Sequence, residues 1–451
     1  MIDRRRPGGV VTGIARAWRS VSLYGGDHPV AGRAVEEAFG TIADQLATRP
    51  SLRLFIHEDT FYMGRTVLLE ESLHWGALLA EFVDRQVGTI EFQPGIEPWE
   101  LRRLIEVLSL RPAELERHGG AATALQRREV RHIIVSRTRP MLADELVQFR
   151  VDPRDVYRAG LRVVDNLYHQ ASRDRPLDLK TAAMIVSSLI DVLTEDRAAL
   201  LGIAALKLYD EETAHHSVNV AALSLLVGLH LQLDRPAMNT LGLAALLHDI
   251  GKVRIPHEVL TKQDPPTSDE RDQVRRHPLY GAHLLRTLPG PSRLAMVVAF
   301  EHHANYNLSG YPEITMKKAP HPLTRIIQMA DFFDAATASL RPDRRSMLPS
   351  EAMTFVLERA GGAFDPSLAR VFAQVLGRYP VGSVVELTNG EVAVVTRPGD
   401  RDTSRPVVKI VADRDSQPVT PRTVNLEEAP EVQIVRALDP TDVSVDVTAH
   451  L

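Results

Sequence analysis

Five histidines and three carboxylates stand inside apolar, helix-forming stretches between residues 212 and 331, and they constrain this chain more than any other feature. An ionisable side chain is costly to bury without a partner. One buried histidine is usually an ordinary core residue, but a bound metal cluster would satisfy all eight groups together. The chain has no cysteine, which excludes disulfides and thiolate metal sites and leaves imidazole and carboxylate as the strong ligands. The pattern therefore predicts a helical domain built around a metal site.

Length and composition indicate a folded protein of several domains. The chain has 451 residues, of which 44% are apolar and 25% charged, enough for two or three globular domains. A net charge of -5 provides no basic surface, so we expect no nucleic-acid polymer as a partner. The basic N-terminus lacks the apolar segment of a secretory signal, and no run of 18 apolar residues predicts a membrane span. We therefore expect a cytoplasmic protein.

Changes in periodicity divide the chain into three zones, roughly 1–150, 151–380 and 379 to the end. Runs such as "LRLFIHED" and "TFYMGRTVLL" predict a β-hairpin, and a helix beginning at Pro98 follows. Helical periodicity then takes over, until a strand pattern returns around the Asn389-Gly390 turn. We expect a multidomain fold: an N-terminal α/β module over 1–150, a helical linker over 151–180, an all-α domain over 181–378 and a small C-terminal β-rich extension over 379–451. The first part is either regulatory or dimerising, or a packing domain without a signalling role.

Two of the helical segments carry ligands at suggestive spacings. Glu212 and His216 are four residues apart and would share one helix face. In "LLHDIGK" His248 and Asp249 are neighbours at a helix end, which we expect Gly251 to terminate. Neighbours on a helix point about 100° apart, so they cannot simply chelate one ion. The pair instead suits a multi-metal cluster, in which the carboxylate bridges two ions and the imidazole binds one.

Three further segments supply the remaining groups. His277 is expected near the end of a helical run, where Pro278 lacks an amide hydrogen. His302 and His303 are adjacent, and Asp331 stands on an apolar helix. Each alone has a simple structural explanation, such as a helix cap or a pair with an arginine. Taken together, they favour a metal site.

These segments, in this order, resemble the HD-GYP family, a branch of the HD metal-dependent phosphohydrolases. The resemblance covers roughly residues 180–378 and rests on "HSVNV", "LLHDIGKVRIPHEVLTK", "HPLYGAHLL", "HH" followed by "GYP", and "MADFFDA". It implies an all-helical catalytic domain with two or three metal ions. It also implies hydrolysis of the second messenger cyclic di-GMP to linear pGpG, and to GMP after a second cut.

The resemblance also assigns roles to individual residues. Asp249 and Lys252 would be catalytic, with Lys252 also contacting phosphate. A third metal is favoured by Glu212, at a position where many relatives have an aromatic residue. The implied substrate-binding residues are Lys252, Gly310, Tyr311, Pro312, Arg341 and Arg344. The implied metal ligands are Glu212, His216, His248, Asp249, His277, His302, His303 and Asp331.

The chain departs from the family pattern on the substrate side. Ala304, Asn307 and Leu308 stand where the family usually has Glu and then Asp-Gly. The segment before Arg341 is one residue longer than usual, and Asp343 replaces a common tyrosine. None of these changes removes an implied metal ligand. They bear on the substrate loop, and therefore on rate and on the choice of nucleotide.

The ligand types and the reaction predict a mechanism. Imidazole and carboxylate suit iron or manganese, while zinc, cobalt and nickel are not excluded. Two ions about 3.5–4 Å apart can position a bridging hydroxide that attacks phosphorus in line. Asp249 would bridge the ions, and Lys252 with Arg341 would stabilise the developing charge.

Two other functions remain open. The chain could be a degenerate module that signals by binding nucleotide or protein, or it could be a phosphohydrolase acting on a different nucleotide. A cyclic dinucleotide is the expected partner. A homodimer and signalling protein partners are further candidates.

Overall fold

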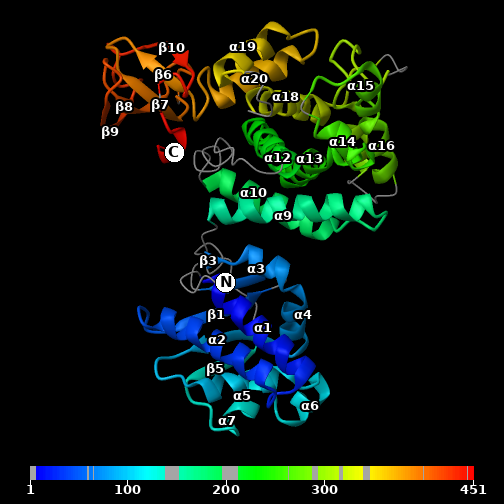
Figure 1. Cartoon of the computed structure of the whole chain (residues 1–451), viewed down its shortest axis with the longest axis vertical. Helices are drawn as coiled ribbons and strands as arrows, with labels where there is room; N and C mark the ends of the chain where they lie inside the picture. Colours follow the sequence, from blue (N-terminus) through cyan, green and yellow to red (C-terminus); the bar gives the residue numbers. More distant parts are fainter. Residues whose placement is uncertain are drawn as a thin grey trace. The chain divides into compact units, whose positions relative to one another are not determined.

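The computed structural model describes residues 7–57, 60–63, 66–137, 152–195, 212–262, 264–286, 293–313, 318–338, 346–399, 401–443 and 445–450 (Figure 1). These residues form two compact units, Met1–Ala159 and Gly160–Leu451. A sheet-containing region comes first in the chain, a helical region follows, and further strands end it, in agreement with the expected fold class. The three boundaries between the four parts expected from the sequence remain predictions.

The first unit contains an antiparallel sheet with the strand order β3-β2-β1-β4-β5. The expected hairpin is present, because β1 pairs with β2 and Leu54 lies opposite Met63. Alternation buries Leu54 and Ile56 of β1 on the core face, while Arg53 between Leu52 and Leu54 is exposed. The strands are β1 (Leu52–His57), β2 (Thr60–Met63), β3 (Thr66–Val67), β4 (Val87–Phe92) and β5 (Ile133–Arg137).

Helices complete the core of this unit. The helix expected at Pro98 is α5, and the Glu100 carboxylate in its first turn accepts a hydrogen bond from the amide of Glu97, the N-cap residue. It packs against α1 and α2, which form an antiparallel pair. The helices are α1 (Gly8–Tyr24), α2 (Pro29–Leu46), α3 (Leu69–His74), α4 (Gly76–Asp84), α5 (Pro98–Ser109), α6 (Pro112–Arg117) and α7 (Ala121–Gln126).

Helices also build most of the second unit. Its central pair, α12 and α13, packs against α10, α17 and α18. Local sequence explains several helix starts: Asp234 accepts a hydrogen bond from the Ala237 amide, and Asp365 accepts one from Ser367, each followed by a proline in the first turn. The helices are α9 (Pro153–Ser172), α10 (Leu179–Glu195), α12 (Glu212–His230), α13 (Arg235–Leu247), α14 (His257–Leu260), α15 (Ser268–Val274), α16 (His277–Leu285), α17 (Arg293–Glu301), α18 (Pro322–Thr337), α19 (Pro349–Glu358) and α20 (Pro366–Leu376).

Two helix boundaries differ from expectation. Helix α13 ends at Leu247, so His248 and Asp249 lie in a turn that leads into the short 3-10 helix η1 (Ile250–Arg254). Gly251 therefore does not end the helix. Its role is close packing, since a Cβ there would lie 2.0 Å from the carbonyl oxygen of His277.

The second difference concerns His277, which begins α16 and does not end the preceding helix. Pro278 occupies the first turn of α16. A proline is well tolerated there, because the first amides of a helix have no intrahelical acceptor. The expectation that Pro278 marks the end of a helix is therefore wrong.

The C-terminal strands form a second antiparallel sheet with the order β10-β6-β7-β8-β9. The expected Asn389-Gly390 turn joins β6 to β7, and Gly390 has a φ of 83°. None of the described helices has the length and apolarity needed to cross a membrane. The elements are β6 (Val384–Leu387), β7 (Val392–Arg397), β8 (Val407–Ala412), β9 (Pro418–Asn425), β10 (Ile434–Leu438) and the 3-10 helix η3 (Val447–Ala449).

Candidate metal centre

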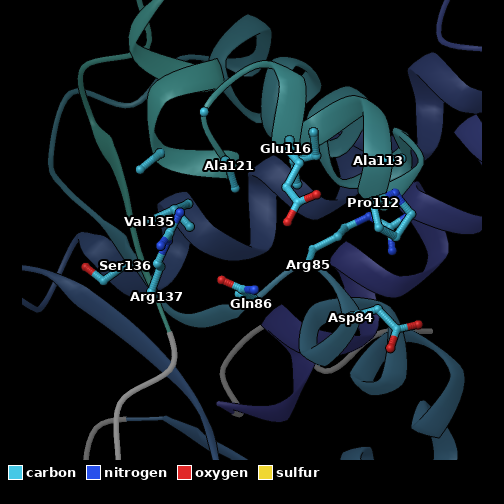
Figure 2. A pocket seen from close by; sticks show the side chains of 14 residues that line it. Asp84, Arg85, Gln86, Pro112, Ala113, Glu116, Ala121, Val135, Ser136 and Arg137 are labelled. Atoms are coloured by element: carbon cyan, nitrogen blue, oxygen red, sulfur yellow. The ribbon is translucent and has the colours of Figure 1, made fainter.

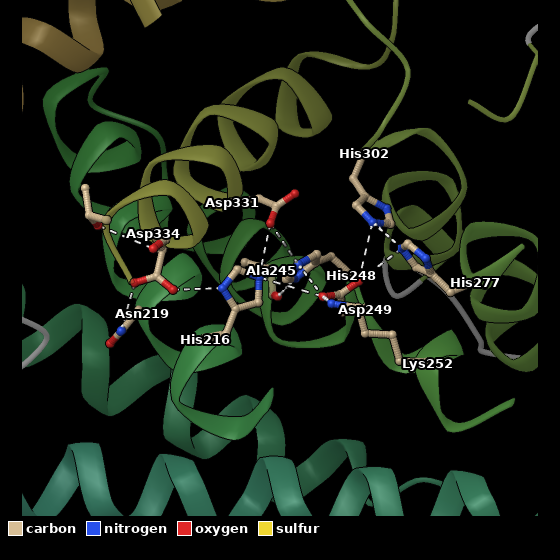
Figure 3. A network of polar contacts seen from close by, with 11 residues as sticks. His216, Asn219, Ala245, His248, Asp249, Lys252, His277, His302, Asp331 and Asp334 are labelled. Atoms are coloured by element: carbon tan, nitrogen blue, oxygen red, sulfur yellow. Dashed lines mark hydrogen bonds and ion pairs between the residues drawn. The ribbon is translucent and has the colours of Figure 1, made fainter. Parts of the chain in front are cut away.

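Seven of the eight implied ligands meet in the second unit. They come from α12, the turn after α13, the start of α16, the turn after α17 and the middle of α18, and Figure 3 labels all of them except His303. The side chain of the eighth, Glu212, lies outside the described part of the structure. The seven are His216, His248, Asp249, His277, His302, His303 and Asp331.

Asp249 stands at the centre of the cluster and belongs to two donor groups. One comprises Asp249, His277, His302 and His303, and the other His216, His248 and Asp249. Its Oδ1 lies 3.1 Å from His277 Nε2 and 3.6 Å from His302 Nε2. Its Oδ2 lies 3.4 Å from His248 Nε2 and 3.7 Å from His216 Nε2. Each carboxylate oxygen thus faces a different set of imidazoles, an arrangement that suits a bridge between two cations.

Asp331 extends the second donor group. Its Oδ1 lies 3.1 Å from His216 Nε2 and 3.9 Å from His248 Nε2. With Asp249 Oδ2, this places two carboxylate oxygens and two imidazole nitrogens around one point.

Backbone carbonyls orient three of the imidazoles. In each, Nδ1 donates to the carbonyl oxygen three residues earlier in the chain, so Nε2 carries the lone pair and faces the cluster. The pairs are His248 with Ala245 at 2.7 Å, His277 with Val274 at 2.7 Å and His302 with Ala299 at 2.9 Å.

A carboxylate orients the fourth imidazole. His216 Nδ1 lies 2.8 Å from Asp334 Oδ2, and Asn219 Nδ2 donates to Asp334 Oδ1 at 2.9 Å. Because Asp334 accepts at Nδ1, it directs Nε2 of His216 toward Asp249 and Asp331. A carboxylate behind a ligating histidine raises the basicity of that ligand.

The donor set fits a divalent cation. His277 Nε2 and His302 Nε2 are 3.0 Å apart, although both carry lone pairs. Two nitrogens at right angles on one cation, each about 2.1 Å from it, would be about 3.0 Å apart. His248 Nε2 and Asp249 Oδ1 are buried without a hydrogen bond, which costs about 1–3 kcal/mol for each group in the absence of a partner. The cluster is therefore a divalent-metal site.

Burial and neighbouring charge set the protonation of the cluster. Burial lowers the pKa of His277 and of His303, so both are neutral near pH 7. Burial opposes ionisation of Asp249, but Lys252 and His248 outweigh it and hold the pKa of Asp249 well below its usual range. For His216 burial is outweighed by Asp331 and Asp334, which raise its pKa to about 10. A cation bound at His216 must therefore displace a proton.

Lys252 is the cationic neighbour of the central carboxylate. Its Nζ lies 2.5 Å from Asp249 Oδ2, and 29% of its side chain is exposed. The ammonium thus lies at the edge of the cluster, within reach of both the carboxylate and solvent.

The Gly310-Tyr311-Pro312 segment packs beside the second of the adjacent histidines. The Tyr311 ring centroid lies 4.6 Å from that of His303, and the Tyr311 amide donates to the His303 carbonyl. Gly310 has a φ of 101°, and a Cβ there would lie 2.3 Å from the same carbonyl oxygen. Pro312 is partly exposed. The segment therefore holds His303 in place.

The three substitutions relative to the family pattern lie in one tight loop. Ala304 is buried, and its carbonyl accepts from Gln328 Nε2. The Asn307 amide donates to Gly362, and Leu308 has a φ of 68°. The loop is thus held by its backbone. Arg341, Arg344 and Asp343 lie outside the described residues.

Two neighbours of the cluster had no assigned role in the sequence analysis. Asp334 orients His216, and its spacing of one helical turn from Asp331 could have indicated this. Tyr168 of α9 lies near the cluster: burial, together with the charge of Asp249, raises the pKa of its hydroxyl. No spacing in the sequence links Tyr168 to the other residues.

A pocket of about 310 Å³ in the first unit contrasts with the metal centre. It is lined by parts of α4, α6, α7 and β5, and the side chains of Gln86 and Glu116 face it (Figure 2). Arg85 beside it is held by the Leu110 carbonyl. Both metal-donor groups found among the described residues lie in the other unit. Neither of these two donor groups therefore lines this pocket.

Known proteins match both the helical and the C-terminal regions. The family model of the HD domain matches residues 194–368, and that of a KOW domain associated with the HD domain matches residues 384–445. A cyclic di-GMP phosphodiesterase of Pseudomonas aeruginosa is 32% identical over 286 residues, which cover 63% of this chain and 68% of that protein.

Two further relatives match shorter stretches. A cyclic di-GMP phosphodiesterase response regulator of Xanthomonas campestris is 29% identical over 218 residues, 48% of this chain and 57% of its own length. A 3'3'-cGAMP-specific phosphodiesterase of Vibrio cholerae is 32% identical over 168 residues, 37% of this chain and 36% of its own length.

Proposed function

Since this chain belongs to the HD-GYP branch of the HD-domain phosphohydrolases, we propose that it is a metal-dependent phosphodiesterase that hydrolyses cyclic di-GMP to linear pGpG. The observation that carries the proposal is the position of Asp249, whose two oxygens face two separate sets of imidazole nitrogens. Phosphodiester cleavage needs a positioned nucleophile and neutralisation of charge at phosphorus. A two-cation site meets both requirements.

The metals we propose are iron or manganese, bound as two ions that share Asp249. Zinc, cobalt and nickel can bind the same types of ligand and are not excluded. The first site would take His277, His302 and His303 with Asp249, and the second His216, His248 and Asp331 with Asp249. Glu212 would complete a third site.

When bound, two divalent cations activate water as a nucleophile at neutral pH and offset charge on the phosphoryl oxygens. The chain's own residues hold that reaction in place. Three backbone carbonyls and Asp334 fix the imidazoles, so the ligands need no rearrangement during the reaction. Lys252 lies beside the cluster, where its ammonium can move from Asp249 to a phosphate oxygen.

Buried and exposed ligands divide the cluster into a closed side and an open side. His248, His277 and His302 are essentially buried, whereas 14% of the His216 side chain and 13% of the Asp331 side chain are exposed, and His303 is also partly exposed. The substrate would therefore approach across these three partly exposed ligands and Lys252.

The second candidate is hydrolysis of a different cyclic dinucleotide. It is favoured by Ala304, Asn307 and Leu308 on the substrate side, and by the relative that is specific for 3'3'-cGAMP. The same substitutions also favour a module that binds metal and nucleotide without turnover. Against that third reading stands the full set of seven converging ligands.

Anaerobic purification, metal analysis and chromatography of the reaction products test the proposal. We expect about two equivalents of metal, or three if Glu212 completes a third site, and conversion of cyclic di-GMP to pGpG, with GMP after a second cut. Bound metal without turnover of any cyclic dinucleotide would favour the binding module. Turnover of cyclic GMP-AMP alone would favour the second candidate.

Other expectations remain predictions. They are the regulatory or dimerising role of residues 1–150, the homodimer, the signalling protein partners and the cytoplasmic location.

A further inference from the structure

Arg275 ends a row of side chains in ring contact that starts at the metal centre. The ring of His302 lies 4.1 Å from that of His303, and the His303 ring lies 4.6 Å from that of Tyr311. The guanidinium carbon of Arg275 lies over the Tyr311 ring, 5.6 Å from its centroid. Arg275 follows α15 directly and precedes His277 by two residues. The row thus runs from the buried His302, through the partly exposed His303, to an exposed cation.

The charge of Arg275 is available to a ligand. Its carboxylate neighbour among the described residues is Asp272, 3.9 Å away, with 59% and 68% of the two side chains exposed. An exposed pair at this distance contributes little. Lys252, by contrast, is in contact with Asp249 at 2.5 Å. Among the described residues, Arg275 therefore lies against the Tyr311 ring and its printed carboxylate neighbour is the exposed Asp272.

The proposed substrate has a group that matches this cation. A cyclic dinucleotide contains two phosphodiesters, and hydrolysis to the linear product breaks one while the other keeps its negative charge. The metal centre, with its cations bound, would bind the phosphodiester under attack. The second phosphodiester must then lie beside the metal centre. There, a cation outside the centre would stabilise its negative charge in the complex.

We propose that Arg275 binds the phosphodiester that is not being cleaved, and so selects dinucleotides over single phosphodiesters. This rests on the proposed function. A guanidinium suits the role because its planar fork can bind two phosphate oxygens while its face stays on the Tyr311 ring. A contact of this kind binds the substrate equally in the ground and transition states, so it acts on KM and not on kcat.

Arg275→Ala, Arg275→Lys and the matched control Arg276→Ala test the assignment. Arg276 is the adjacent arginine and is also exposed. Steady-state rates would be measured with cyclic di-GMP and with bis(p-nitrophenyl) phosphate, which has one phosphodiester and no second phosphate. For Arg275→Ala we expect a KM for cyclic di-GMP raised about tenfold with kcat within about twofold. Hydrolysis of bis(p-nitrophenyl) phosphate should be unchanged, and Arg276→Ala should behave like the unaltered protein on both substrates.

The lysine variant and salt sharpen the test. Lysine keeps the charge, so Arg275→Lys should recover part of the KM, and the effect of Arg275→Ala should shrink as salt increases. A lysine no better than alanine would overturn the phosphate contact. Equal losses on both substrates would also overturn it, because they would show that Arg275 only supports Tyr311.

The proposed function can fail separately. If the unaltered protein leaves cyclic di-GMP intact, inhibition of bis(p-nitrophenyl) phosphate hydrolysis by the intact dinucleotide replaces KM as the readout. A tenfold weaker inhibition of Arg275→Ala would then support the role of Arg275 without the activity. No inhibition of the unaltered protein, or equal inhibition of both, would overturn it.

Discussion

Two buried carboxylates, Glu100 in the first unit and Asp249 in the second, have opposite surroundings. Their exposed fractions are 1% and 2%. Glu100 accepts hydrogen bonds from the amides of Arg131 at 2.7 Å, His132 at 3.0 Å and Glu97 at 3.1 Å. Asp249 Oδ1 accepts none and faces imidazole nitrogens that carry lone pairs. Burial alone therefore does not indicate function, whereas burial among groups that only a cation can satisfy does.

The same contrast extends to the interiors of the two units. The core of the first unit is a continuous cluster of apolar side chains on one sheet face and its covering helices. The Glu100 carboxylate accepts hydrogen bonds from an amide at the start of α5 and from an amide just before β5, so it links these two elements. The interior of the second unit instead brings together imidazoles from four separate segments. A bound cation would therefore stabilise that interior.

The largest expected effect is that of Asp249→Ala. Loss of the shared carboxylate should remove several kcal/mol of stabilisation at the reacting centre, roughly a thousandfold or more in turnover. The fold should persist, because the change also removes a buried charge that lacks a hydrogen bond at Oδ1. Turnover, metal content and circular dichroism measure the three consequences. Turnover close to that of the unaltered protein would disprove the bridging role.

Glu100→Ala is the counterpart in the first unit and should act on stability alone. Three amides lose a charged acceptor, so we expect about 3 kcal/mol of destabilisation, with metal content and turnover unchanged. Burial opposes ionisation of Glu100, but hydrogen bonds from His132 and Arg131 outweigh it and lower its pKa below 4.5. A lowered pKa contributes stability above the unfolded value that is lost as pH falls through the folded value.

Urea unfolding at several pH values from 7 to 3 therefore measures both the loss of stability in Glu100→Ala and the dependence of that loss on pH. The difference in stability between the unaltered protein and Glu100→Ala should be constant above about pH 5 and should shrink below about pH 4.5. A loss of bound metal in a well-folded Glu100→Ala protein would contradict the division of roles between the two carboxylates.

Asp334→Asn should have an intermediate effect, because Asp334 orients a ligand and is not one itself. Removing a carboxylate behind a ligating histidine lowers metal affinity about 10–100-fold. Turnover should recover at high metal concentration, which Asp249→Ala should not do. Metal titrations of Asp334→Asn and of Asn219→Ala, which weakens the same contact indirectly, measure this. Equal metal affinities in the unaltered protein and in both variants would rule out the orienting role of Asp334.

Much of this arrangement was accessible from the sequence, because it depends on local signals. The Asn389-Gly390 hairpin, the helix at Pro98 and the ligands that converge all follow from turn residues, periodicity or motif order. His277 was placed in the wrong part of its helix because a proline is compatible with a first turn as well as with a helix end. His277 was correctly expected in the cluster, but it lies at the start of a helix and not near the end of one.

Contacts between distant segments could not be predicted. Arg275 lies over Tyr311, 36 residues further along the chain, and Asp334 meets His216 across 118 residues. Glu100 shows the same limit, since its partners at 131 and 132 are set by the packing of α5 beside β5. Tertiary packing decides such pairs, and no spacing in one sequence encodes them.

The smallest expected effect concerns the substrate loop, where Leu308 has a φ of 68°. A left-handed backbone is strained for a residue with a Cβ, and glycine relieves that strain while losing more entropy on folding. The two terms nearly offset, so Leu308→Gly should stabilise the protein by only about 0.5 kcal/mol. Thermal unfolding measures this change, and metal content should stay constant.

Gly310→Ala is the matched test in the same loop and should act in the opposite direction. Its new Cβ would lie 2.3 Å from the carbonyl oxygen of His303, so the backbone beside a proposed ligand must move. If Leu308→Gly changes metal content as much as Gly310→Ala does, the loop and the metal centre are one unit, and the substitution at Leu308 bears on the metals as well as on the nucleotide. If only Gly310→Ala changes the metal content, the backbone at Leu308 can change without loss of bound metal. We expect this result, because Tyr311, next to Gly310, contacts the ring of His303.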